Sequence, residues 1–71
     1  MDVVKLMGRN VRVLRLERGL TQEELAHRCE MERSYVSDLE RGRRNPSVKA
    51  LGRLAAALGV APEALLRAIA D

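Results

Sequence analysis

The chain of 71 residues has no phenylalanine and no tryptophan, and Tyr35 is its only aromatic residue. Its core must therefore be built from Leu, Val, Ala, Met and Ile, a composition that favours helices. Proteins that bind single-stranded nucleic acid stack the bases on several aromatic side chains, so this class is excluded. A chain this short buries only roughly 60% of the surface of its extended form, so dimerisation would add to its stability.

Cysteine and histidine are equally scarce. Cys29 is the only cysteine, so no internal disulfide forms, which is typical of proteins from a reducing compartment. His27 and Cys29 are too few and too close together for a metal site, because no second pair of ligands exists. A single histidine also leaves no nucleophile–base pair, so we expect neither an enzyme nor a cofactor.

Long apolar runs are missing as well. The longest purely apolar stretch is Leu54–Leu58, far too short to span a membrane, and the sequence contains no signal peptide. With 46% hydrophobic and 32% charged residues, the chain is typical of one folded domain over residues 1–71. We expect a cytoplasmic protein, associated with the nucleoid if it binds DNA.

The positive charge is concentrated in one part of the sequence. The net charge is +3 and the pI is about 9.8. Residues 17–32 sum to −3, from five Glu and two Arg, whereas residues 33–53 sum to +4, from six cations and two acids. Charge alone is as consistent with a solvated surface as with a nucleic-acid site, so the position of this basic block decides its meaning.

Apolar residues recur at helical spacing along the chain, and no segment has the alternation of a strand. Thr21 with Glu24 predicts a capping box, Ser47 is a good N-cap, and Pro62 suits a first helical position. The pattern predicts an all-α fold of five helices, at Val3–Arg18, Gln22–Cys29, Arg33–Arg41, Val48–Leu58 and from Pro62 onward.

The second and third expected helices are joined by a short turn and form a candidate DNA-binding unit. A helix fits the major groove and presents its outer face to base edges. Gln22 opens the second helix, where unpaired N–H groups favour a phosphate, and cations flank the far end of the third. The candidate DNA-binding residues are Gln22, Arg33, Ser34, Tyr35, Ser37, Asp38, Arg41, Arg43, Arg44 and Asn45.

Individual side chains in this set have distinct expected roles. Arg33 can make a bidentate contact to guanine, and Asp38 can accept from a cytosine amino group or repel a wrong base. For Arg33 alone, a solvated surface arginine is the competing interpretation. Tyr35 leaves two alternatives, packing against the first or fourth helix with its hydroxyl outward, or contact with a phosphate or sugar.

Residues 11–66 resemble the phage repressor/Cro-type helix-turn-helix regulators. The segment Glu32–Arg41, followed by Arg43–Asn45, looks most like the controller proteins of restriction–modification systems. The matching motifs are Val11–Arg12–x–Leu14–Arg15, Gly19–Leu20–Thr21–Gln22–x–x–Leu25–Ala26, Val36–x–x–Leu39–Glu40–x–Gly42, Pro46–Ser47 and Leu51–x–x–Leu54–Ala55–x–Ala57–Leu58–Gly59–Val60.

This resemblance implies a five-helix, lambda-repressor-like domain that regulates transcription as a homodimer on a pseudo-palindromic operator. It implies that Arg15 and Glu40 form a structural ion pair rather than contact bases. Leu65, Leu66 and Ile69 are then the candidate dimer interface, the alternative being that they close the monomer core. RNA polymerase is a further candidate partner, and the residues do not distinguish an activator from a repressor.

The sequence departs from the family pattern at two positions in the turn. Glu30 stands where the family favours glycine with positive φ, which strains a non-glycine residue by roughly 1 kcal/mol. Glu32 stands where serine or threonine usually caps the third helix. The competing functional class is an antitoxin or another protein-interaction module with secondary DNA binding, and the little chain left over to wrap a partner disfavours it.

Overall fold

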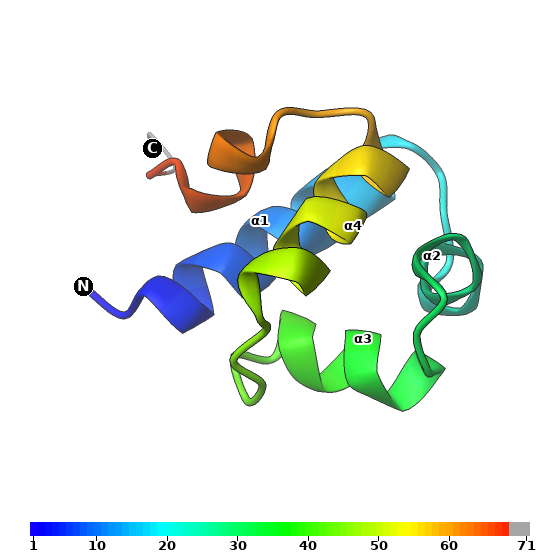
Figure 1. Cartoon of the computed structure of the whole chain (residues 1–71), viewed down its shortest axis with the longest axis horizontal. Helices are drawn as coiled ribbons and strands as arrows, with labels where there is room; N and C mark the ends of the chain where they lie inside the picture. Colours follow the sequence, from blue (N-terminus) through cyan, green and yellow to red (C-terminus); the bar gives the residue numbers. More distant parts are fainter. Residues whose placement is uncertain (69–71) are drawn as a thin grey trace.

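The computed structural model describes residues 1–68, and within them every regular element is a helix. The described chain has four α-helices and one 3-10 helix. In Figure 1, α1 passes behind α4, and α3 lies below both. The predicted all-α class is confirmed. The elements are α1 (Val3–Glu17), α2 (Gln22–Cys29), α3 (Arg33–Glu40), α4 (Val48–Leu58) and a 3-10 helix, η1 (Pro62–Leu66).

The predicted fifth α-helix is wrong, because η1 is a single short 3-10 helix. The backbone becomes extended again at Arg67, with φ −77° and ψ 133°. Asn10 of α1 explains this end, since its Nδ2 donates to the carbonyl oxygens of Leu65 and Arg67, both at 2.9 Å. The buried amide of Asn10 thus binds the carbonyl groups at the end of η1 and holds the chain in an extended conformation there.

The helix starts follow local signals in the sequence. Thr21 Oγ1 accepts from the Glu24 backbone N–H at 3.0 Å, and Glu24 Oε1 accepts from that of Thr21 at 2.9 Å. The predicted capping box is therefore present. Ser47 caps α4 in a similar way, accepting from the Ala50 N–H at 3.0 Å. The first turns of α2 and α4 are thereby fixed by side chains of their own segments.

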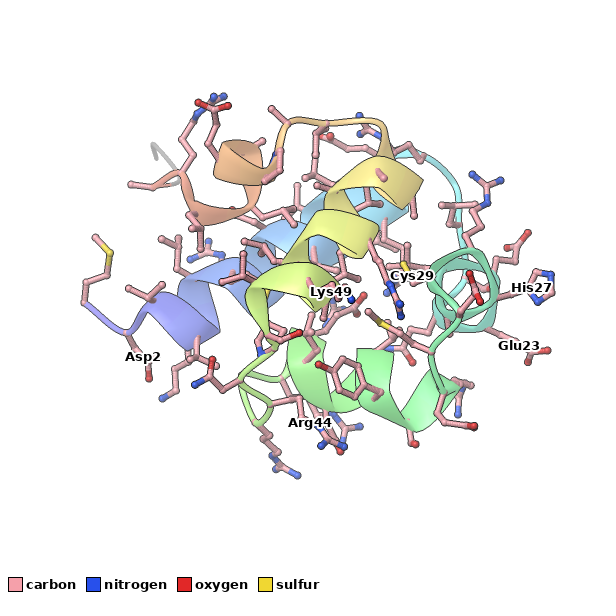
Figure 2. All side chains as sticks on the ribbon, in the orientation of Figure 1. Asp2, Glu23, His27, Cys29, Arg44 and Lys49 are labelled. Atoms are coloured by element: carbon pink, nitrogen blue, oxygen red, sulfur yellow. The ribbon has the colours of Figure 1, made fainter. Side chains whose placement is uncertain are left out.

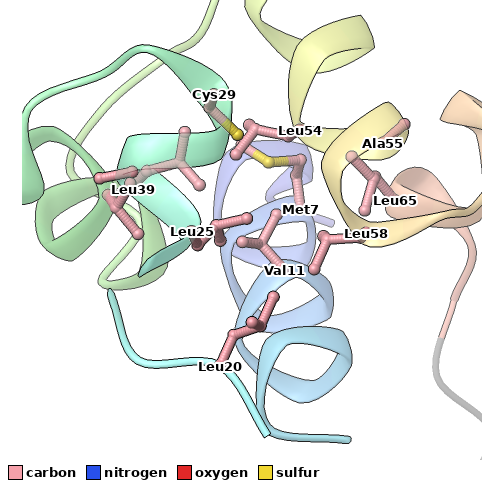
Figure 3. Close-up of a cluster of buried hydrophobic side chains, with 12 residues drawn as sticks. Met7, Val11, Leu20, Leu25, Cys29, Leu39, Leu54, Ala55, Leu58 and Leu65 are labelled. Atoms are coloured by element: carbon pink, nitrogen blue, oxygen red, sulfur yellow. The ribbon is translucent and has the colours of Figure 1, made fainter. Parts of the chain in front are cut away.

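The core is aliphatic, as the lack of aromatic residues requires. Figure 3 shows side chains from α1, α2, α3, α4 and η1 meeting in one cluster. Leu65 of η1 belongs to it and is completely buried. The buried members are Met7, Val11, Leu20, Leu25, Ala26, Cys29, Val36, Leu39, Leu54, Ala55, Leu58 and Leu65.

The C-terminal end of α3 lies directly against the backbone of α1. A methyl group on Gly8 would overlap the carbonyl oxygen of Leu39 and would lie 3.2 Å from that of Glu40. Only glycine allows this approach, so Gly8 sets how closely α3 is held to the first helix. The helix that is expected to read DNA therefore ends on a rigid support.

Candidate nucleic-acid interface

The turn between α2 and α3 contains the strained residue that the sequence predicts. Glu30 has φ 56° and ψ 44°, in the left-handed region, and it is the only non-glycine residue with positive φ in the described chain. Glu32 precedes α3 without a side-chain hydrogen bond to it, unlike the caps of α2 and α4. The turn between α2 and α3 therefore forms with a glutamate in the left-handed region and without a side-chain cap on α3.

The polar residues of α3 lie on the side of the helix opposite its buried residues. Val36 and Leu39 are completely buried. Ser34, Ser37 and Arg41 follow at helical spacing on the outer side, where Ser34 and Arg41 are exposed and Ser37 is half-buried. Arg33 is exposed at the start of this face and Asp38 is half-buried beside it. Four predicted residues of α3 and Arg41 at its C-cap thus form one outward face, whereas Tyr35 of the same helix packs against the core.

A polar network joins α1, α2 and α3 beside this face. Arg15 Nε lies 2.6 Å from Glu40 Oε2, and Arg15 Nη2 donates to Glu40 Oε1 at 3.0 Å. Arg15 Nη1 also donates to the carbonyl of Leu20 at 2.8 Å. The ion pair is nearly inaccessible to water, with 9% and 3% of the two side chains exposed. The hydrogen bond to Glu40 raises the pKa of Arg15.

The same network holds Gln22, which sequence reasoning assigned to a phosphate. Its Nε2 donates to Glu40 Oε1 at 3.2 Å, so one of its two amide hydrogens is directed inward. The other amide hydrogen and the amide oxygen remain for a ligand. Gln22 also lines an open hollow of about 870 Å³ together with Arg33, so two predicted DNA contacts share one concave surface.

The loop between α3 and α4 carries the second group of predicted contacts, and Arg43, Arg44 and Asn45 are all exposed in it. The Arg44 guanidinium lies over the Tyr35 ring, with its Cζ 4.6 Å from the ring centroid. Figure 2 shows Arg44 beside α3 at the lower edge of the molecule. Tyr35 is half-buried against the core, so packing decides the position of its ring, and the ring in turn supports Arg44.

The predicted dimer residues are divided by the structure. Leu65 is fully buried and fills the monomer core, so it is not available to a partner and its assignment to the interface is wrong. Leu66 is 44% exposed, and Ile69 lies outside the described residues. Leu66 borders a small hollow of about 100 Å³ with Val3 and Val48, which are 53% and 86% exposed. The spacing of apolar residues in the sequence did not predict that either valine is exposed.

Other kinds of site find little support in residues 1–68. No group of three or more His, Cys, Asp or Glu side chains there is arranged to hold a metal ion. No helix in that range is long and apolar enough to cross a membrane. The polar face of α3 and the exposed apolar surface around Val48 are therefore the two features that need an explanation.

The comparison with protein families identifies this arrangement. The family model described as Helix-turn-helix matches residues 11–65. The chain belongs to this helix-turn-helix family. The resemblance expected from the sequence motifs is thereby confirmed, and the match includes all of α2, α3 and α4.

Related proteins and structures agree with the assignment. The HTH-type transcriptional regulator y4dJ of Sinorhizobium fredii is 57% identical over 60 residues, which cover 84% of this chain and 78% of the relative. The restriction–modification controller protein C.AhdI from Aeromonas hydrophila is similar in structure, with a TM-score of 0.84 and 45% identity over 90% of this chain and 96% of that one. The biofilm regulator SinR, solved in complex with DNA, has a TM-score of 0.81 and 34% identity over 86% and 98% of the two chains.

Proposed function

We propose that this helix-turn-helix protein is a transcriptional regulator that binds a specific double-stranded DNA sequence as a homodimer. The observation that carries the proposal is the outward polar face of α3, with Gln22 hydrogen-bonded to Glu40 at the end of this helix and the exposed loop Arg43–Asn45 following it. A groove-binding helix needs base-reading side chains in its middle and phosphate-binding groups at both edges. This arrangement supplies both.

The exposed apolar surface supports a dimer. Val3, Val48 and Leu66 come from three different elements and line one hollow. A second copy that covers this surface would bury these side chains. A two-fold axis there would place the two copies of α3 about 34 Å apart, on half-sites one helical turn from each other.

A narrower assignment is to the controller proteins of restriction–modification systems. The 45% identity to C.AhdI over nearly the whole of both chains supports it. In that role the protein would act on the chromosome in the cytoplasm, and contact with RNA polymerase would accompany activation. The position of the operator relative to the promoter would decide between activation and repression.

Selection of binding sites from a random duplex library tests the proposal directly. We expect purified protein at physiological salt to enrich a two-fold symmetric motif, because specific contacts add to the sequence-independent phosphate attraction. Enrichment of an asymmetric motif would retain the DNA-binding role and remove the dimer. No enrichment above background would overturn the function and favour the antitoxin-like class, in which a protein partner is the main ligand.

A further inference from the structure

Four residues of α1 form a row beside the C-terminal end of α3. Lys5, Gly8, Arg12 and Arg15 follow one another at spacings of three or four residues, so they lie on one side of the helix. Gly8 lies against the last carbonyl groups of α3, and Arg15 pairs with Glu40 of that helix. Lys5 reaches the second residue after α3, since a methyl group on Gly42 would be 2.7 Å from the Cγ of Lys5.

The outer edge of this row points away from the core, as the outward face of α3 does. Met7 and Val11 each precede a member of the row by one residue, about 100° around the helix, and both point into the core. The core also lies behind Val36 and Leu39 of α3. The row and α3 meet at the C-terminal end of α3, where Gly8 lies against the carbonyl groups of Leu39 and Glu40.

Two cations of the row have no structural partner to neutralise them. Lys5 and Arg12 are exposed, and no carboxylate of residues 1–68 lies within ion-pair distance of either. Arg15 differs, because Glu40 already holds its guanidinium. With the exposed Arg41 and Arg43 near the end of α3, Lys5 and Arg12 continue a basic surface onto a helix outside the helix-turn-helix unit.

We propose that Lys5 and Arg12 of α1 bind DNA phosphates next to the groove that α3 occupies. The proposal rests on the proposed DNA-binding function and extends its contact surface. Lys5 precedes residue 11, where the family match begins, so the match itself does not assign it a role. The competing role is purely structural, in which both cations stabilise the negative end of the α3 dipole and touch no ligand.

The DNA affinity of variants without these charges, measured at several salt concentrations, distinguishes phosphate binding from a structural role. We would compare Lys5→Gln, Arg12→Gln and the double variant, using a duplex with the selected site and one of mixed sequence. Each lost phosphate contact should lower the slope of log affinity against log salt by about 0.9 on both duplexes. The defect of each single variant should therefore be about 3.5-fold larger at roughly 50 mM salt than at 200 mM, and that of the double variant about 12-fold larger.

Arg53→Gln is the matched control. Arg53 is also an exposed helical arginine without an ion pair in the described chain, but it lies on α4, where its carbonyl meets Cys29 of α2. Arg53→Gln should keep the wild-type slope of log affinity against log salt. Arg12→Lys should also have the wild-type slope, unlike Arg12→Gln, because lysine keeps the positive charge.

Three outcomes would overturn the inference. Wild-type slopes in the double variant would leave the DNA-binding function intact and reduce Lys5 and Arg12 to a structural role. An equal loss in Arg53→Gln would show a general effect of net charge. Absence of binding to either duplex by the wild-type protein would remove the proposed function together with this extension.

Discussion

The proposed DNA-binding surface and the exposed apolar surface around Val48 are organised by opposite means. On the proposed DNA-binding surface, a hydrogen bond from Gln22 to Glu40 and stacking of Arg44 on Tyr35 fix the side chains in place. On the apolar surface, Val48 is 86% exposed and Val3 is 53% exposed. A polar side chain is satisfied by water until its ligand arrives, whereas exposed apolar area lowers the free energy only when a partner covers it. The first surface is ready to bind alone, and the second requires another molecule.

The largest effect should come from breaking the network behind the proposed DNA-binding surface. Glu40→Ala removes the partner of a nearly buried arginine and should lower the free energy of unfolding by about 3–5 kcal/mol. Denaturant titration measures this loss. An Arg15→Met, Glu40→Leu double variant should recover most of it, since no unpaired charge remains. A loss below about 1 kcal/mol in Glu40→Ala would show that the pair is not essential to stability.

The apolar surface should respond to a charge in a different way. Val48→Asp should weaken self-association by about 1.5–3 kcal/mol per copy, because an apolar side chain is replaced at the proposed contact. Sedimentation equilibrium would show the monomer, while thermal unfolding of that monomer should change little. Val13→Asp is the matched control, since Val13 is 42% exposed on α1 and lies outside the hollow around Val48. Equal weakening by both variants would move the contact elsewhere.

Two arginines of the proposed DNA-binding surface should separate base recognition from phosphate attraction. Arg33→Ala should reduce discrimination at one base pair by about 1–3 kcal/mol, as expected for loss of a bidentate guanine contact. Arg44→Ala should instead weaken all sequences alike and lower the salt slope by about 0.9. Competition binding with single-base operator variants distinguishes the two. An unchanged sequence ranking in Arg33→Ala would contradict its position in the groove.

The smallest effect concerns the backbone between the two helices. Glu30→Gly should raise the free energy of unfolding by up to about 1 kcal/mol, because glycine adopts positive φ without strain, although its greater freedom in the unfolded chain offsets part of the gain. Gly19→Ala is the reverse control, since Gly19 has φ 66° with no atom near a new methyl group. It should destabilise by a similar amount, and denaturant midpoints would compare the two. A less stable Glu30→Gly protein would mean that the Glu30 side chain contributes contacts of its own.

What spacing and capping signals predicted well was local, and the Arg15–Glu40 ion pair, whose partners are 25 residues apart, came instead from the family resemblance. The capping box of Thr21 and Glu24 involves residues three apart, and the positive φ of Glu30 follows from its place in a known turn. The features missed join distant parts of the chain. Asn10 reaches residues 55 and 57 positions away, and the Arg44–Tyr35 stacking links a loop to a helix. No periodicity encodes such pairs, because they depend on how the helices meet.

The assignment of Leu65 shows the same limit within a short distance. An α-helix from Pro62 onward would have placed Leu65, Leu66 and Ile69 along one side. In the 3-10 helix that forms instead, Leu65 enters the core and its neighbour Leu66 stays exposed. The hydrogen bonds that hold the chain where η1 ends come from Asn10 of α1, which is far away in sequence. The residues around Leu65 alone therefore could not predict which leucine is buried and which is exposed.

The buried thiol of Cys29 provides a chemical probe of the separation of α2 from α4. Cys29 is 2% exposed, its Sγ lies 3.7 Å from the carbonyl oxygen of Arg53, and burial raises its pKa. In the native state it is therefore a poor nucleophile, and a thiol reagent can reach it only when α2 and α4 separate. Because it is the only cysteine in the chain, its rate of labelling would measure how often α2 and α4 separate. A slower rate in the presence of DNA would show that DNA binds and that bound DNA makes this separation rarer.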